Sequence, residues 1–182
     1  MTDMKNLQGT YILDNTHSTL GFVARHAMIT KVRGSFTDFS GTAQVNGQDP
    51  AASSVTVDIN VASIDTRNAD RDAHLTSGDF FEVEKFPKIT FASTQVQAVD
   101  ADTVEITGDL TIKSVTKSVT IPFEFTGAAT DPFGNERIGF EGKTEVNRRE
   151  FDLTWNAALD TGGVLVSEKI TLEFEISAIK QA

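Results

Sequence analysis

Alternation of apolar and polar residues with a period of two runs through most of this chain. Apolar side chains occupy most of the alternate positions in five stretches, residues 20–28, 55–61, 104–112, 119–125 and 170–178. The residues between them are mostly Thr, Ser, Asp, Glu and Lys. Because successive side chains of a strand point to opposite faces of a sheet, the pattern indicates antiparallel strands with one dry and one solvated face.

Turn-forming residues such as Asn46-Gly47 separate these stretches, which favours a barrel or a sandwich over isolated hairpins. Strands of about 9–12 residues at about 40° of tilt give a barrel about 25–30 Å tall, more than a barrel filled by side chains needs. Residues 66–82 do not alternate, and their apolar side chains recur near helical period. They predict one or two short helices that close one end of the barrel. The length of 182 residues suits a single domain, residues 1–182.

Composition and charge exclude several classes of function. With 16 basic and 26 acidic residues the net charge is −10, which disfavours nucleic-acid binding and broad docking on an anionic membrane surface. The absence of cysteine removes disulfides and thiol chemistry. No secretory signal and no run of 18 apolar residues is visible, so we expect a cytoplasmic protein, or a periplasmic one if a leader has been removed.

Patterns of catalytic and metal-binding residues are weak. The chain has no G-x-S-x-G and no phosphate-binding loop, so we expect no enzyme. Asn68, Asp70, Asp72 and Asp79 resemble a calcium loop, but Ala73 stands where the turn glycine belongs. The three histidines are too far apart for a zinc motif. We therefore expect no metal site.

Two histidines admit both a structural and a functional interpretation. Period two places His26 on the dry face with Phe22 and Ala24, as a core imidazole or as a polar contact to a ligand head group. His74 follows Arg71 by three residues, so the two share a helix face that either crowns a pocket mouth or is simply solvated.

The aromatic inventory is the strongest positive signal. Phe accounts for 13 residues, against one Tyr and one Trp, and most of these rings lie in the alternating stretches. Such rings fill the core of a small barrel, but in a tall barrel they line a dry cavity. The residues alone favour neither a solid core nor a ligand cavity. The candidate lining residues are Phe22, Phe36, Phe39, Phe91, Leu110, Ile112 and Phe123.

Five blocks of sequence resemble a known family. They are DNTHSTLGFVARH, VRGSFTDFSG, VASIDTRNADRDAHLTSGDFFEVEKFPKITFAS, GDLTIKSVTKSV and RREFDL. In this order they are similar to the YceI-like family, also called polyisoprenoid-binding proteins of lipocalin-like fold. The resemblance implies a mainly β fold, an extended antiparallel barrel of about eight strands. Asn15 and Asp152 depart from the family pattern, which usually has Pro and Gly there.

The resemblance also implies a function. We expect binding, storage or transport of a polyisoprenoid, such as an isoprenoid quinone, or of a similar long-chain amphiphilic lipid, with no cofactor besides a bound polyprenyl chain. Family members are commonly dimers, which implies a homodimer. A structural or stress-response barrel with a filled core, or an enzyme acting on a lipid, are the alternatives. The polar residues expected at the mouth or head group are His26, Arg71, His74, Lys117 and Arg148.

Overall fold

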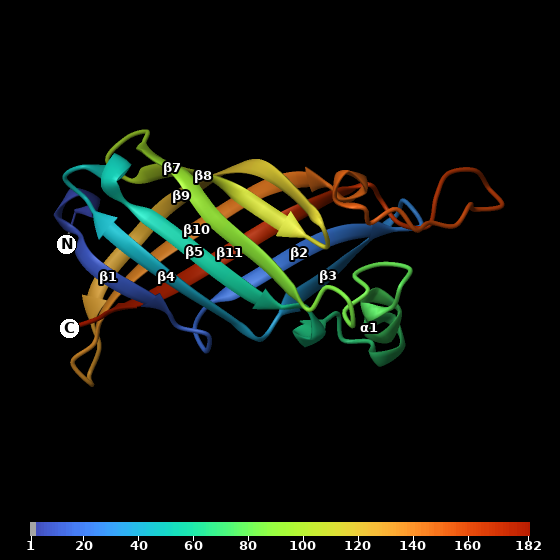
Figure 1. Ribbon diagram of the computed structural model, residues 1–182, viewed down its shortest axis with the longest axis horizontal. Coiled ribbons are helices and arrows are strands. Elements are labelled where there is room, and N and C mark those ends of the chain that lie inside the picture. Colours follow the sequence, from blue (N-terminus) through green and yellow to red (C-terminus); the bar gives the residue numbers. More distant parts are fainter. Residues whose placement is uncertain (1–2) are drawn as a thin grey trace.

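The computed structural model describes residues 3–182, and an antiparallel sheet closed into a barrel dominates it (Figure 1). Pairing of the first barrel strand with the last closes the sheet. The barrel strands, in spatial order, are β1 (Gln8–Leu13), β4 (Phe39–Asn46), β5 (Ser54–Asn60), β7 (Lys88–Ala98), β8 (Thr103–Ile112), β9 (Val115–Thr130), β10 (Glu136–Asn147) and β11 (Lys169–Lys180). This confirms the predicted eight-stranded barrel.

Three further strands extend the wall beyond the closed ring. They are β2 (Thr19–His26), β3 (Thr30–Phe36) and β6 (Ile64–Asp65). The long strand β11 supports this extension, because it pairs with β1 near Ile179 and with β2 from Thr171 to Glu175. The β2–β3 hairpin therefore continues the barrel lengthwise and makes it tall.

One α-helix and four short 3-10 turns complete the fold. These are α1 (Ala69–Thr76), η1 (Met4–Asn6), η2 (Pro50–Ala52), η3 (Val61–Ser63) and η4 (Arg148–Phe151). Helix α1 confirms the helix expected within residues 66–82. It lies at one end of the barrel, and the two termini lie at the other (Figure 1).

The residues that resembled a calcium loop shape the start and surroundings of α1. Asn68 caps the helix by accepting a hydrogen bond from the Arg71 amide at 3.0 Å. The Asp72 carboxylate accepts bonds from the Thr66 amide and hydroxyl, at 3.0 and 2.6 Å. Asp79 contacts His74. Their spacing thus reflects local hydrogen bonding around the helix.

The buried core is divided into two clusters. One, at the α1 end, contains Phe36, Val61, Phe80 and Phe151 among others. The other surrounds Tyr11 near the termini. The middle of the barrel belongs to neither cluster, and a cavity lies there. Across residues 3–182, no helix is long and apolar enough to cross a membrane.

Candidate functional site

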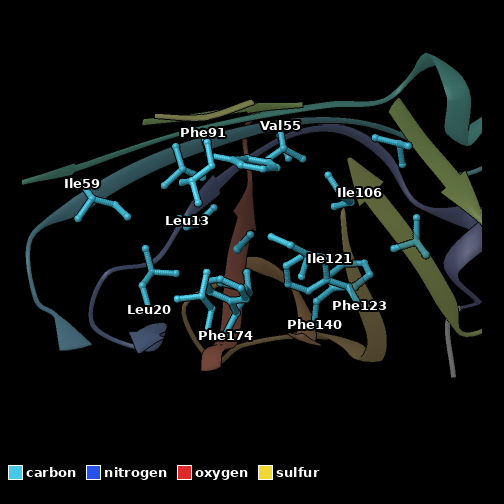
Figure 2. A pocket seen from close by; sticks show the side chains of 18 of the residues that line it. Leu13, Leu20, Val55, Ile59, Phe91, Ile106, Ile121, Phe123, Phe140 and Phe174 are labelled. Carbon is cyan, nitrogen blue, oxygen red and sulfur yellow. The ribbon is translucent and has the colours of Figure 1, made fainter. Parts of the chain in front are cut away.

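A cavity of about 510 Å³ runs inside the barrel, within the range of about 300–1,000 Å³ usual for ligand pockets. Its wall is almost entirely apolar. Figure 2 shows Leu20, Phe91 and Phe174 pointing into it from β2, β7 and β11. Ile106 and Phe123 also face inward, yet both are only half-buried, because the space in front of them is empty.

Glycines on neighbouring strands let some of these aromatic rings lie flat against the wall. Phe22 pairs with Gly34 across β2 and β3, and Phe123 pairs with Gly142 across β9 and β10. A Cβ atom added at either glycine would overlap the facing ring. The missing side chains therefore make room for the rings beside the strand, and the centre of the barrel stays open.

The mouth of the cavity lies at the end near the termini. The lining residues that are exposed to solvent all belong to this end, where η1, the β4–β5 connection and the β7–β8 turn meet. They are Asp3, Lys5, Gln44, Ser54, Ala98, Asp100 and Ala101. Lining residues at the α1 end are buried or half-buried, so that end is closed.

Aromatic packing closes the α1 end. The Phe80 ring is 5 % exposed and lies 5.4 Å from the Trp155 ring. The His74 ring meets both edge-on, at 5.2 Å from Phe80 and 4.6 Å from Trp155. Phe81 contacts Phe36 at 6.1 Å. The helix and the segment after η4 thus form one plug over this end.

Arg148 holds the second half of this plug in place. Its guanidinium donates hydrogen bonds to backbone carbonyls of residues 153, 155, 166 and 167, at 2.6–3.2 Å. The side chain lines the cavity and Arg148 is only 4 % exposed, so burial lowers its pKa from the ordinary value. The neighbouring Arg149, rather than Arg148, pairs with Glu168, at 3.4 Å. Arg148 therefore holds the irregular segment between η4 and β11 in place by hydrogen bonds to its backbone.

Six of the seven predicted apolar residues line the cavity, namely Phe22, Phe36, Phe91, Leu110, Ile112 and Phe123. Phe39 is the exception. It is 7 % exposed and pairs with Ile59 across β4 and β5, but it does not contribute to the cavity wall. Phe36 belongs to the α1-end core as well as to the wall. Whether these residues hold a ligand stays a prediction.

The five polar side chains expected at the mouth or head group do not come together at the mouth of the cavity. His26 is exposed at the end of β2, where the barrel wall stops, so the expected buried imidazole is wrong. Arg71 donates to the Thr66 hydroxyl and carbonyl, and His74 contacts Asp79 at 2.9 Å. The fourth residue, Lys117, is exposed on β9. Among the five, Arg148 alone lines the cavity, and it does so away from the mouth.

Away from the cavity, the strongest electrostatic contacts join two turns of the barrel. Arg137 on β10 donates to Asp14 at 2.6 Å and to Asp131 at 2.8 Å. These bonds hold the pKa of both carboxyls well below their usual range and raise the pKa of Arg137. Asp14 belongs to the β1–β2 turn and Asp131 to the β9–β10 turn. This triad of Arg137, Asp14 and Asp131 therefore stabilises the barrel wall by joining two of its turns.

Several lining residues were not among those predicted. They include Leu13, Leu20, Val55, Ile59, Phe140 and Phe174 (Figure 2). The period-two pattern carries the signal for them, because an apolar residue two positions from a lining residue on a strand faces the same side. The mouth carries no comparable signal, because its residues come from turns that meet only in the closed barrel.

Comparisons with known proteins agree with this architecture. The model of the YceI-like domain matches residues 11–178. A UPF0312 protein of Ectopseudomonas mendocina is 40 % identical over 165 residues, which cover 91 % of this chain and 83 % of the relative. Protein YceI of Escherichia coli O157:H7 is 37 % identical over 168 residues, covering 92 % and 84 %.

Solved structures show the same barrel. The YCEI protein of Campylobacter jejuni is 31 % identical, with a TM-score of 0.73 over 87 % of this chain and 90 % of that one. BcnA of Burkholderia cenocepacia, at 23 % identity, has a TM-score of 0.80 over 91 % and 98 %. A polyisoprenoid binding domain from Saccharophagus degradans, at 16 % identity, has a TM-score of 0.73 over 94 % and 98 %. Sequence and fold together show that this chain belongs to the YceI-like family.

Proposed function

We propose that the barrel binds a polyisoprenoid, or a similar long-chain amphiphilic lipid, for storage or transport. The observation that carries the proposal is the apolar cavity of about 510 Å³, closed at the α1 end and open at a mouth near the termini. The Saccharophagus degradans domain of the same fold, described as polyisoprenoid binding, supports the choice of ligand class.

The energetics suit a ligand selected by length. Burial of apolar surface contributes about 0.8 kcal/mol per CH₂ group, or about 3–4 kcal/mol per five-carbon isoprene unit before ordering costs. A few units already approach the practical limit of affinity, so added length gains little by contacts alone. The volume of the cavity therefore sets the chain length that is held.

The placement of charge suits binding better than acid–base catalysis. Within residues 3–182, the ionisable side chains that line the cavity are Asp3, Lys5, Asp100 and Arg148. The first three lie at the mouth, and Arg148 is engaged by four carbonyls. A polar head group would accordingly stay at the mouth, with the apolar chain inside.

A cavity-filling variant tests the proposal. Val57 faces the cavity from β5, whereas its neighbour Thr56 faces outward and is exposed. Delipidated protein would be titrated with polyprenols of increasing length, with bound stoichiometry measured by native mass spectrometry. We expect one polyprenol per chain for the wild type and for Thr56→Trp, and a shorter preferred chain for Val57→Trp. Failure of the wild type to bind any length, or an unchanged preference in Val57→Trp, would overturn the proposal.

A further inference from the structure

The turn between β2 and β3 exposes large apolar side chains. Met28 is 61 % exposed and Ile29 is 78 % exposed at the tip of this hairpin. Val164, 37 % exposed, belongs to the loop that faces the turn, and this loop projects from the α1 end of the barrel (Figure 1). We call residues 25–31 together with the facing loop, residues 157–167, the apex.

The apex presents these side chains on a fixed support. The Ala27 amide donates to the Leu165 carbonyl at 2.7 Å, and the Ser167 amide donates to the Arg25 carbonyl at 3.1 Å. His26 forms an isolated bridge with Val166. The exposed side chains are therefore carried by a hydrogen-bonded pair of segments.

Backbone strain accompanies this exposure. Ala27 and Met28 have φ values of 51° and 65°, and the Ile29 amide closes the turn on the His26 carbonyl at 3.0 Å. Two central residues with positive φ favour Asn-Gly, and Ala and Met adopt this conformation at a cost. A turn that favours glycine carries an exposed methionine instead, which points to a role for that side chain beyond its contact with Gly163 of the facing loop.

The charge around the apex is opposite to that of the whole chain. No Asp or Glu occurs from residue 15 to residue 37, although the net charge is −10. Arg33 pairs with Glu173 at 3.0 Å, which leaves Arg25 and Lys31 as the cations beside the tip. In the facing loop the acidic residue is Asp160. The apex thus carries Arg25 and Lys31 against Asp160, a small positive balance on an otherwise acidic chain.

We propose that the apex docks on the surface of an anionic lipid bilayer. Exposed apolar side chains beside cations suit the boundary between head groups and acyl chains. The tip offers the exposed apolar side chains Met28, Ile29 and Val164, far fewer than the about 20–30 residues per partner usual in stable protein interfaces, which favours a bilayer over a second copy of the chain. Repulsion of the acidic remainder would orient the molecule tip-first, so the overall charge confines docking to this end.

The docked end lies opposite to the mouth of the cavity, so docking and ligand binding are separable. The proposal goes beyond the proposed lipid-binding function, because occupancy of the cavity and attachment to vesicles are measured independently. Variants of the apex are expected to retain whatever ligand the wild type retains, as judged by native mass spectrometry.

Co-sedimentation with vesicles tests the proposal. We expect the wild type to bind vesicles of equal parts phosphatidylglycerol and phosphatidylcholine, to bind pure phosphatidylcholine much less, and to lose binding as salt rises. Removing either cation, in Arg25→Gln or Lys31→Gln, should weaken binding about fivefold. The variant Ala27→Asn/Met28→Gly installs the favoured turn residues, so it removes the exposed Met28 side chain without straining the backbone, and it should weaken binding although Ile29 remains.

A matched control uses the other end of the molecule. Phe133 is 88 % exposed in the β9–β10 turn, and Phe133→Ser should leave vesicle binding unchanged. The proposal is overturned if the wild type does not bind anionic vesicles, or if the Ala27→Asn/Met28→Gly variant binds as the wild type does. Concentration-dependent self-association that these substitutions abolish, without vesicle binding by the wild type, would assign the apex to a second copy instead and would equally overturn it.

Discussion

Arg148 shows how a residue that lines the cavity can serve the fold. Its four backbone acceptors lie in the segment between η4 and β11, which has little regular structure of its own. Buried carbonyls without donors each cost about 1–3 kcal/mol. A side chain predicted to meet a ligand head group therefore supplies donors that the irregular backbone lacks.

Replacing Arg148 should destabilise the protein far more than replacing its neighbour. We expect Arg148→Gln to lower the free energy of unfolding by about 3–5 kcal/mol, because several buried carbonyls lose their donor. Arg149→Gln removes a surface pair to Glu168 and should cost less than about 1 kcal/mol. Urea unfolding monitored by circular dichroism measures the free energy of unfolding of both variants. Equal losses in the two would contradict the structural role of Arg148.

Arg137 should give the protein an acid-sensitive contribution to stability. Asp14 and Asp131 have folded pKa values below their ordinary value of 3.8, because Arg137 binds them. Their contribution is complete above the ordinary pKa and is lost as pH falls through the lowered ones. Arg137→Gln should thus reduce stability at pH 7 and flatten the decline below about pH 4.

A pH series of urea unfolding curves would measure this effect. Arg33→Gln is the control, because Arg33 pairs with Glu173 on the surface and its own side chain is 61 % exposed. In the Arg33→Gln control, the free energy of unfolding should decline with falling pH as steeply as in the wild type. An unchanged acid slope in Arg137→Gln would show that the triad does not contribute.

At the scale of the strands, sequence alone predicts much of the wall but not its ends. The stretches beginning at residues 104, 119 and 170 lie in β8, β9 and β11. Two stretches extend past their strands: Met28 lies in a turn and Val61 begins η3. Alternation continues in sequence there, but the barrel wall ends, so His26 is exposed where period two predicts burial. Strand ends depend on tertiary contacts that a local pattern does not carry.

Glycine on β10 should control how far the barrel is open. Gly142→Ala would push the Phe123 ring off the wall and into the cavity, at a cost of about 1–3 kcal/mol from overpacking. The preferred length of the bound lipid should also decrease, because the displaced ring occupies part of the cavity. The double variant Gly142→Ala/Phe123→Leu should recover much of both properties, because the smaller side chain leaves room for the added methyl group.

The matched control is Gly78→Ala, where an added Cβ meets nothing within 4 Å. This variant should match the wild type in thermal unfolding and in ligand length. If Gly142→Ala behaves like Gly78→Ala, the ring of Phe123 does not need the glycine to lie against the wall.

For the whole molecule, the sequence predicts the class of fold and most of the apolar wall. The number of Phe residues leaves open whether the barrel is full or hollow, because the same rings can fill space or line it. The answer depends on the rings lying flat over glycines such as Gly34, a pairing across strands that requires the register. The position of the mouth likewise depends on which turns come together, so polar residues chosen by motif fell at the closed end.

We propose that a long apolar chain occupies the cavity. Mass spectrometry of an organic extract of protein purified without detergent tests this most directly. We expect about one long-chain isoprenoid or similar lipid per polypeptide, shorter or absent in Val57→Trp and unchanged in Thr56→Trp. An extract without lipid, or one whose lipid is the same in Val57→Trp as in the wild type, would contradict the claim.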